Sequence, residues 1–457
     1  MLTKTDPDII KGYLEDSSNL SGGHAEGVYI PENEKDIREI ITRRNQLTVS
    51  AGETGTTGGC IPFGGWVVSM QRLNKIIDIN PKEKYAIVEP GVSLEEIEKA
   101  VAKENLLYAP DPTEKKATIG GNVATNASGG RGYRFGSTRD HIRRLKIVTP
   151  KGEILNLRRE KAFSRDPLKN SAGYYSKPGM EQIDLFIGME GTLGIVSEVE
   201  IALVPALQET FDIVAFFPSE ELAVDFVLEA KKKKDPTVNF FEYFDENTLQ
   251  MLRPAYSHIP EDAKAAVYIE QEITAENENN YLDDWAKLLE KYKVDIDSCW
   301  LGIEPDQKED LKKFRHAIPE HINELYKQEG IVKMASDIAV PTDKFKEMYD
   351  FYNLQLTTYN LQLFHIKFGH IGENHLHVNL LPKTEEEKKI AKDIIMKYVK
   401  KGISLGGTVS AEHGIGKIKH QYLKEMYGEA GINEMIQIKK DFDPRFILNR
   451  GNIFNPP

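Results

Sequence analysis

Residues 118–130 read TIGGNVATNASGG, a run of small residues in which asparagine and threonine are mixed with glycine and alanine. The turn-like segment Pro110-Asp111-Pro112 precedes it. A flat ring with polar edges can press against such a surface, because bulky side chains would hold the ring off the backbone. The stretch therefore predicts a backbone surface that carries a planar cofactor.

Two further glycine-rich segments have the same character. Residues 52–59 read GETGTTGG and follow a strand-like run at 47–50, and residues 188–195 read GMEGTLGI and lead into a predicted strand at 195–204. Glycines let backbone N–H groups converge on an anion, so a pyrophosphate is the natural ligand of the first loop. Neither GxGxxG nor GxxxxGK[ST] is present in that loop. One such loop is a common surface turn, whereas three together indicate a nucleotide cofactor.

Composition excludes several classes of protein. A chain of 457 residues is long enough for two to four domains. With 59 Lys plus Arg against 71 Asp plus Glu, the net charge of −12 argues against a nucleic-acid partner. Two cysteines exclude a disulfide scaffold, a four-thiolate zinc site and an iron–sulfur cluster. The start of the chain has no apolar signal region, so a cytoplasmic protein is expected.

The rest of the first half alternates between strand and helix patterns. Residues 35–45 have helical spacing, 85–89 read as a buried strand, and Ser93 is expected to cap a helix. Residues 145–157 read as a hairpin around a turn at 150–152. Further on, 220–231 is helical, and the four lysines at 231–234 are expected to form a solvated face.

Histidines concentrate in the second half, where six of the 11 lie between His365 and His420. Residues 361–377 read LQLFHIKFGHIGENHLH, which predicts a hairpin with its turn at 371–374. Alternation in the following strand places His375, His377 and Asn379 on one face. His370 and His377 would face opposite sides of an uninterrupted strand, so the turn is what brings them together.

Residues 406–414 read GGTVSAEHG and add the carboxylate of Glu412 and the imidazole of His413. Two histidines and one glutamate leave an open coordination position and suit Zn²⁺, with Mn²⁺ or Fe²⁺ as alternatives. Each histidine taken alone is better explained as a polar residue of an ordinary hairpin. The set taken together favours a metal site.

The first half resembles the vanillyl-alcohol-oxidase/PCMH superfamily of FAD-binding proteins. The matching segments are GETGTTGG (52–59), VEPGVSLEEI (88–97), PDPTEKKATIGGNVATNASGG (110–130) and EGTLGIVSEVEIALVP (190–205). The resemblance implies an α+β fold with a two-subdomain PCMH-type FAD-binding domain. Since the first loop lacks the histidine that members with covalent FAD commonly use, non-covalent FAD is expected. The implied cofactor residues are Gly52, Thr54, Gly55, Thr56, Thr57 and Gly58 at the pyrophosphate, Thr118, Gly121, Asn122, Thr125, Ser128 and Asn449 at the flavin, Ile195 toward the adenine half, and also Pro110, Glu190 and Gly194.

The second half resembles the C-terminal domain of the FAD-linked oxidases. GHIGENHLHVN (369–379) and SAEHGIGKIK (410–419) are similar to its GHxGDGNLHxN and EHGIGxxK signatures, nearest to D-lactate, glycolate and D-2-hydroxyglutarate dehydrogenases. The resemblance implies an α+β cap domain with an antiparallel sheet at 206–411, after an FAD domain at 1–205, and a segment at 412–457 that returns to the FAD domain. It also implies the metal ligands His370, His377 and Glu412, the catalytic base His413, and the substrate contacts Arg315 and Asn379.

Three positions depart from the family pattern. Its Asp-Gly-Asn is Glu373-Asn374-His375 here, so His375 is either an outer hydrogen-bond partner of a metal ligand or an alternative ligand, and the motif does not specify which metal ion binds. Ala335 stands near the place where some relatives carry a lysine that meets a distal carboxylate, which argues against a diacid substrate unless Lys333 takes over that contact. Arg450 replaces a proline of the family in Asn449-Arg450-Gly451.

These features predict FAD-dependent oxidation of a small D-2-hydroxyacid to the 2-oxoacid, with hydride transfer to the flavin and metal assistance. Electrons would pass to an external acceptor, such as an electron-transferring flavoprotein, a cytochrome or a quinone, and such a partner could hold the protein at a membrane. A homodimer is expected. The rivals are a non-redox enzyme of the alkyl-dihydroxyacetone-phosphate synthase type, whose long N-terminal extension this sequence lacks, a non-catalytic flavoprotein-like partner subunit, and a metallohydrolase.

Overall fold

The computed structural model describes residues 1–161, 165–277, 280–331, 333–358 and 363–456. These residues form two compact units with an α+β architecture. The first contains Met1–Ser128, Gly136–Ala206 and Ser410–Pro457, and the second contains Gly129–Phe135 and Leu207–Val409. Among the described residues, no helix has the length and apolar character needed to cross a lipid bilayer.

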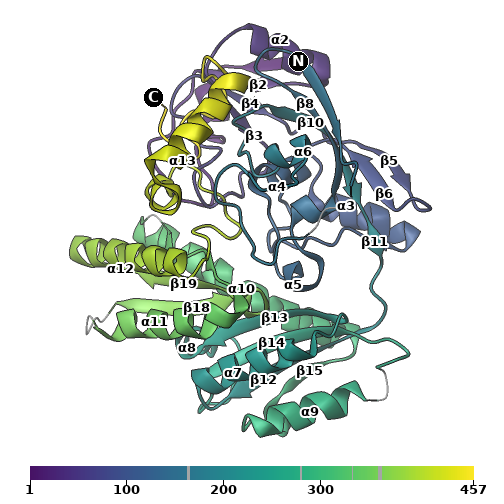
Figure 1. Cartoon of the computed structure of the whole chain (residues 1–457), viewed down its shortest axis with the longest axis vertical. Helices are drawn as coiled ribbons and strands as arrows, with labels where there is room; N and C mark the ends of the chain where they lie inside the picture. Colours follow the sequence, from purple (N-terminus) through teal and green to yellow (C-terminus); the bar gives the residue numbers. More distant parts are fainter. Residues whose placement is uncertain (162–164, 278–279, 332, 359–362, 457) are drawn as a thin grey trace. The chain divides into compact units, whose positions relative to one another are not determined.

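The first unit contains two main sheets (Figure 1). In the four-stranded sheet β1-β2-β4-β3, β4 pairs in parallel with β2 and β3, and the five-stranded sheet β5-β6-β10-β8-β9 is antiparallel. Its strands are β1 (Leu2–Lys4), β2 (Gly27–Ile30), β3 (Leu47–Ser50), β4 (Trp66–Ser69), β5 (Ile76–Asn80), β6 (Tyr85–Val88), β7 (Leu106–Leu107), β8 (Ile142–Val148), β9 (Ile154–Arg158), β10 (Ile195–Ala202) and β11 (Val204–Pro205).

Helices complete the first unit: α1 (Pro7–Lys11), α2 (Glu34–Thr42), α3 (Leu94–Val101), α4 (Ile119–Thr125), α6 (Gln182–Leu185) and α13 (His420–Phe442). The predicted cap at Ser93 is confirmed, because its hydroxyl accepts from the backbone N–H of Glu96 and the Glu96 carboxylate accepts from Ser93. The apolar face of α2 packs with Ile195, Ile447 and Leu448 in one buried cluster. The C-terminal segment is therefore part of the core of the first unit.

The second unit is built on an antiparallel sheet in the order β15-β12-β14-β13-β18-β19-β16, with β17 also paired to β19. Its strands are β12 (Thr210–Phe217), β13 (Val238–Asp245), β14 (Ala265–Glu272), β15 (Trp300–Gly302), β16 (Met334–Ala335), β17 (Ile338–Ala339), β18 (Phe364–Gly369) and β19 (His375–Leu381). Its helices are α5 (Gly132–Phe135), α7 (Glu220–Ala230), α8 (Glu246–Leu252), α9 (Tyr281–Lys291), α10 (Pro305–Glu329), α11 (Phe345–Thr358) and α12 (Glu385–Ser404).

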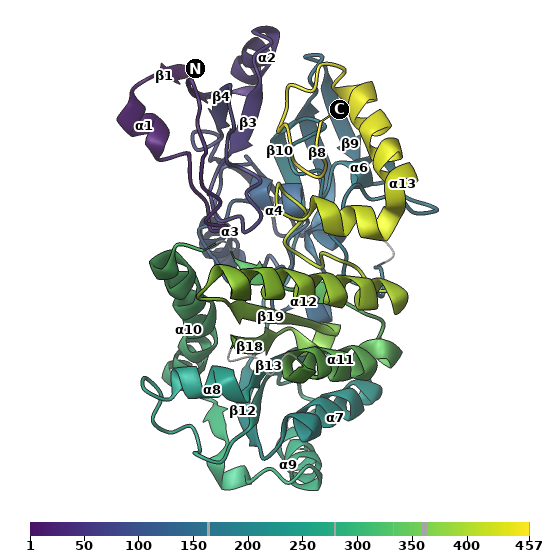
Figure 2. The same cartoon turned by 90° about the vertical axis from the view of Figure 1, so that its left-hand side faces the viewer.

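Helices cover both faces of this sheet. On one face, apolar residues of α8 and α10 pack against alternate residues of β12, β13, β14 and β18. On the other face, Phe226 of α7 and Trp285 of α9 pack on Phe217 and Phe241. Helix α12 packs on β16 and β17 and runs beside β19 (Figure 2). The histidine-bearing strands are thus held in the interior of the second unit.

Candidate functional site

The predicted pyrophosphate loop directly follows β3 and is anchored by the C-terminal segment of the first unit. The carbonyl oxygen of Thr57 accepts from the backbone N–H of Lys417 at 2.9 Å, and Lys417 Nζ lies 3.2 Å from the carbonyl oxygen of Gly58. A Cβ at Gly416 would lie 2.1 Å from the Thr57 oxygen, so only glycine allows this approach. Burial lowers the pKa of Lys417 to about 8.

The predicted flavin surface forms the start of α4. The Thr118 hydroxyl caps this helix by accepting from the N–H of Gly121, and a Cβ at Gly120 would lie 2.9 Å from the carbonyl oxygen of Pro90. Asn122 is 2% exposed, and its Nδ2 has no hydrogen-bond partner among the described residues. A buried amide donor without a protein acceptor fits a ligand that presents carbonyl or ring-nitrogen acceptors, as a flavin does. The residues present therefore fit FAD.

The third glycine turn is tied to both neighbouring loops. Glu190 has a left-handed backbone (φ +52°), and its carboxylate accepts from the backbone N–H groups of Ile415 and Gly416 at 2.6 and 2.7 Å. Burial raises the pKa of Glu190 to about 7. Asn449 accepts from Val49 N and donates to the Glu190 carbonyl oxygen, so it links β3 to this turn. The first unit thus brings the predicted residues Thr57, Glu190 and Asn449 into one network.

The remaining predicted cofactor residues occupy several environments. Ser128 is buried, and its carbonyl oxygen accepts a hydrogen bond from the backbone N–H of Asp111. The Thr125 hydroxyl donates a hydrogen bond to the Gly121 carbonyl oxygen. Ile195 begins β10 with its side chain in the apolar cluster of α2, and Gly194 packs its backbone against Ile147.

Glu412 and His413 belong to the loop that follows residue 410 in the first unit. The Glu412 carboxylate accepts from the Ser128 hydroxyl at 3.1 Å and lies 2.9 Å from Nζ of Lys169, whose side chain is only 5% exposed. His413 Nε2 lies 3.7 Å from Glu412, and the Thr57 hydroxyl donates to the His413 carbonyl oxygen. The predicted base therefore contacts the pyrophosphate loop through its backbone carbonyl group.

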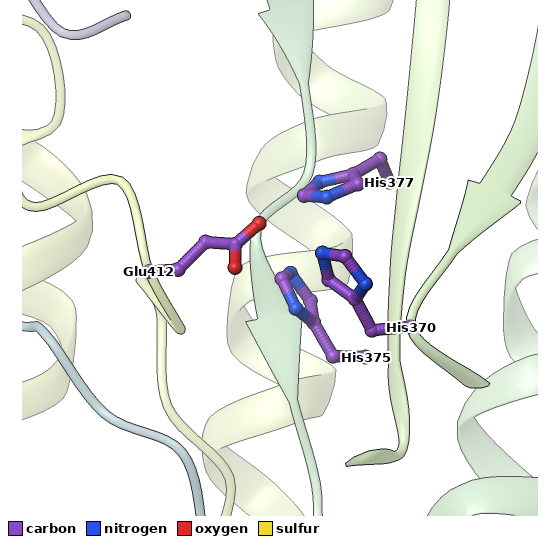
Figure 3. Close-up of side chains that lie close together, drawn as sticks. All are labelled: His370, His375, His377 and Glu412. Carbon is purple, nitrogen blue, oxygen red and sulfur yellow. The ribbon is translucent and has the colours of Figure 1, made fainter. Parts of the chain in front are cut away.

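Three histidines gather where β18 passes into β19 in the second unit (Figure 3). The ring centroids of His370 and His377 are 5.5 Å apart, and those of His375 and His377 are 4.6 Å apart. The three histidine residues are at most 7% exposed. The prediction that the turn brings His370 and His377 together is confirmed. Glu412, also labelled in Figure 3, belongs to the other unit.

The backbone of the turn makes room for these rings. A Cβ at Gly369 (φ +120°) would lie 2.9 Å from Cδ2 of His377. Asn374 adopts the left-handed conformation, and its side-chain oxygen accepts from Nζ of Lys231 at 2.5 Å. The predicted solvated face at 231–234 is therefore wrong for Lys231: its amine is turned inward, and burial lowers its pKa to about 8. Residues 361–362, where the predicted hairpin begins, lie outside the described residues.

Glu242 of β13 connects two of the predicted site residues. Its Oε1 accepts from His370 Nδ1 at 2.7 Å and from Arg315 Nη2 at 3.0 Å. When His370 donates from Nδ1, the lone pair of the imidazole is on Nε2. A carboxylate that fixes this tautomer is the usual outer partner of a metal-ligating histidine. Nothing in the sequence motifs pointed to Glu242, although a carboxylate inside the apolar run NFFEYF was a signal.

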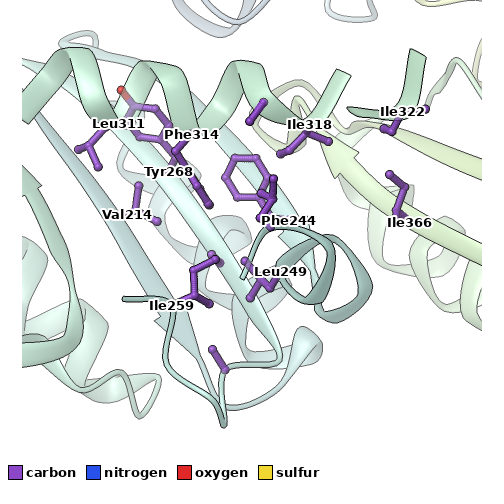
Figure 4. Packing of buried hydrophobic residues seen from close by; sticks show 14 of the residues in the cluster. Val214, Phe244, Leu249, Ile259, Tyr268, Leu311, Phe314, Ile318, Ile322 and Ile366 are labelled. Carbon is purple, nitrogen blue, oxygen red and sulfur yellow. The ribbon is translucent and has the colours of Figure 1, made fainter. Parts of the chain in front are cut away.

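Arg315 projects from α10, a helix held on the sheet by the apolar cluster shown in Figure 4. Phe314 and Ile318 lie in that cluster beside Phe244 and Tyr268. The Arg315 side chain is 10% exposed, and its guanidinium lies over the Phe240 ring at 5.3 Å. A Cβ at Gly130 would lie 2.3 Å from Arg315 Nη2, so glycine admits the guanidinium there. Arg315 is therefore not the surface residue that its lysine-rich helix alone indicates.

Asn379, the predicted substrate contact, is fully buried on β19. Its Nδ2 lies 3.4 Å from the His377 carbonyl oxygen, and its Oδ1 finds no donor within the part of the chain that the structure describes. Ala335 of β16 is its partner across the strands.

The histidine cluster fits a divalent metal. One nitrogen from each of His370, His375 and His377 lies within 4.8 Å of the others. Imidazole nitrogens in this grouping suit Zn²⁺ and neighbouring first-row ions. Unlike an ordinary polar hairpin, the rings are buried together and backed by a carboxylate.

Comparison with known protein families agrees with this geometry. Residues 208–453 match the family described as FAD linked oxidases, C-terminal domain, and residues 25–158 match the FAD binding domain family. The chain belongs to the FAD-linked oxidases. It is accordingly an FAD-linked oxidoreductase, and the resemblance found in its sequence is confirmed.

Curated relatives of this FAD-linked oxidase cover nearly its whole length. It is 30% identical over 419 residues to D-lactate dehydrogenase of Anaerostipes hadrus. This alignment covers 89% of this chain and 84% of the relative. It is 30% identical over 451 residues to the glycolate oxidase subunit GlcD of Bacillus subtilis, and the alignment covers 97% of this chain and 92% of that relative. A mitochondrial D-lactate dehydrogenase [cytochrome] of Arabidopsis thaliana is 26% identical, and the alignment covers 100% of this chain and 78% of that relative.

Solved structures share the fold of this FAD-linked oxidase at lower sequence identity. A 4-ethylphenol oxidase from Gulosibacter chungangensis matches with a TM-score of 0.73 and 16% identity, covering 100% of this chain and 94% of that one. An alkyldihydroxyacetonephosphate synthase matches with a TM-score of 0.71 and 17% identity, and the match covers 98% of this chain and 81% of that one. These likenesses confirm the α+β fold of the PCMH type.

Proposed function

We propose that this FAD-linked oxidase oxidises a small D-2-hydroxyacid of the D-lactate or glycolate class to the 2-oxoacid. The observation that supports it most is the pairing of Arg315 and His370 on one buried carboxylate, Glu242. This places a guanidinium for an anionic substrate next to imidazoles that can hold a metal. The names of the two relatives at 30% identity, D-lactate dehydrogenase and a glycolate oxidase subunit, support the same substrate class.

Arg315 is proposed to bind the substrate carboxylate. A guanidinium offers a planar fork of N–H donors that meets a carboxylate with two parallel hydrogen bonds. Asn379 is proposed to orient the same substrate from β19. Its strand partner is Ala335, and an alanine provides no cation for a second carboxylate, so a monocarboxylate is favoured over a diacid.

His370, His377 and Glu412 are proposed to hold a divalent metal, with zinc favoured over manganese or iron. The family motifs imply these three ligands. The proximity of the buried His370 and His377 rings supports the two histidines of the set. Bound FAD would supply the hydride acceptor, and the metal a Lewis acid that lowers the pKa of the substrate hydroxyl. His413 is proposed to take the hydroxyl proton on its imidazole as the Cα hydride departs, as a general base does.

Electrons are proposed to leave to an external acceptor, because the two cysteines of the chain cannot ligate an iron–sulfur cluster. An electron-transferring flavoprotein, a cytochrome and a quinone are the candidates, and a cytochrome is the one printed in the name of the Arabidopsis relative. A homodimer in the cytoplasm completes the proposal.

Anaerobic mixing with hydroxyacids tests the proposed reaction. D-Lactate or glycolate is expected to bleach the visible flavin absorbance, whereas L-lactate leaves it unchanged. Protein stripped with EDTA is expected to keep FAD and to be reduced at least 100-fold more slowly, because a Lewis acid contributes several kcal/mol to such a step. Re-added Zn²⁺, Mn²⁺ or Fe²⁺ should restore the rate. Equal reduction by verified metal-free protein would refute metal assistance.

Glu242→Gln tests how the site is positioned. The amide keeps the shape of the side chain but removes the charge shared by His370 and Arg315. Loss of such an outer carboxylate typically weakens metal binding 10- to 100-fold, so a decrease of this size is expected in titrations of the stripped protein with Zn²⁺. Glu270→Gln is the matched control, at a carboxylate on the neighbouring strand β14 that is equally buried (2% exposed). Equal zinc affinities of the two variants would contradict the assignment.

A further inference from the structure

His375 is the residue at which this chain departs from the family motif beside the predicted metal ligands. The motif has asparagine at this position, whereas this chain has a third histidine. His375 is completely buried, and it starts β19 on the same face as His377. Its ring centroid is 4.6 Å from that of His377 and 5.6 Å from that of His370. Its ring is therefore closer to that of His377 than the ring of His370 is, and its distance from His370 differs by only 0.1 Å from the 5.5 Å between His370 and His377.

Asp337 provides His375 with the carboxylate that a ligating imidazole usually has. Nε2 of His375 lies 3.0 Å from Oδ1 of Asp337, and the two side chains are 0% and 1% exposed. Asp337 comes directly before β17, which pairs with β19 at His375. His370 has a buried carboxylate neighbour as well, since its Nδ1 is hydrogen-bonded to Glu242 on β13. A separate buried carboxylate thus lies beside each of two of the three imidazoles, as is usual for metal-bound histidines.

We infer that His375 is a third imidazole ligand of the metal site, in addition to the ligands of the proposed function, so that the substrate hydroxyl would enter as a fifth ligand. The inference rests on the metal site of the proposed function and specifies which ion that site takes. Imidazole nitrogen suits zinc and its neighbours, whereas an asparagine carbonyl oxygen suits harder ions such as manganese. A third imidazole nitrogen is therefore expected to strengthen the binding of zinc more than the binding of a harder ion such as manganese.

The alternative is that His375 and Asp337 are a buried structural pair that joins β17 to β19. Such a pair would affect folding stability without touching the metal. The two roles differ in the number of imidazoles bound to the ion and in the selectivity between ions, and both quantities can be measured without turnover.

X-ray absorption spectroscopy of the unmodified holoprotein loaded with Zn²⁺ gives the first test. Three imidazoles are expected in the zinc coordination shell, and a shell with two would overturn the inference. This measurement needs no substitution, so it does not depend on whether a variant folds.

His375→Asn, which restores the residue of the family motif, gives the second test. The stripped variant is expected to bind Zn²⁺ at least 10-fold more weakly and Mn²⁺ with nearly unchanged affinity in competition with a chelator. The visible spectrum of bound Co²⁺ should change as well. His365→Asn is the matched control on β18, because His365 nitrogens lie near Asn247 and the Leu363 carbonyl oxygen. Unchanged Zn²⁺ and Mn²⁺ affinities, with a lower melting temperature alone, would establish the structural pair instead.

The outcome is separable from that of the proposed reaction. Flavin reduction by hydroxyacids tests the substrate and the base, whereas zinc coordination and metal selectivity test His375. Three bound imidazoles in a protein that no hydroxyacid reduces would support His375 as a ligand and refute only the substrate assignment.

Discussion

His413→Ala is expected to keep FAD and to lose flavin reduction by D-lactate or glycolate, by about 100- to 10,000-fold, the usual contribution of a positioned general base. FAD should stay bound because the pyrophosphate loop contacts this residue through its backbone: the Thr57 hydroxyl donates to the His413 carbonyl oxygen, which alanine retains. The measurement is the rate of flavin bleaching after anaerobic mixing, together with the ratio of flavin to protein absorbance.

A control substitution distinguishes loss of a base from general damage. His258→Ala, at an exposed histidine, is the control and should behave as the wild type. Rapid reduction of the His413→Ala variant by a hydroxyacid would remove His413 from the role of base.

Much of the fold could be predicted because its signals are local. The capping box at Ser93, the helical spacing of α2 and the hairpin of β8 and β9 each depend on residues within a few positions of one another. The strand order of the second sheet depends on pairings between distant segments, such as β13 with β18. No period or turn in the sequence specifies those partners, so only the family resemblance gave the architecture.

The candidate site divides in the same way. His370 and His377 could be predicted because one turn separates them. Glu242, Asp337 and Lys169 were missed, since each approaches its partner from a distant part of the chain: Glu242 is 128 residues from His370 in sequence. Lys231 was predicted to be solvated because it begins a lysine run. Its amine instead donates a hydrogen bond to Asn374, which is 143 residues away in the sequence. Burial of a charge depends on packing, which short-range patterns do not encode.

Arg315→Met is expected to lower kcat/KM for D-lactate or glycolate by about 30- to 5000-fold. Truncating one partner of a buried charge pair costs about 2–5 kcal/mol, in part because the other charge is left uncompensated. Here that other charge is Glu242, 3% exposed as a side chain, and it would then repel the substrate carboxylate. Arg315→Lys should recover only part of the loss, because an ammonium cannot form the two parallel hydrogen bonds of a guanidinium.

A neutral substrate analogue separates carboxylate binding from damage to the fold. If the Arg315 guanidinium binds the carboxylate, D-lactamide should be a poor substrate of the wild type, and Arg315→Met should change its oxidation by no more than a few-fold. Arg253→Met is the control in the same unit, because its guanidinium donates to the carbonyl oxygens of Pro260 and Ala263 rather than to a carboxylate. An equal loss with the acid and the amide would mean that Arg315 supports the structure around Glu242 and His370. A loss confined to the acid would mean that one buried carboxylate, Glu242, positions both the group that binds the substrate and a histidine beside it.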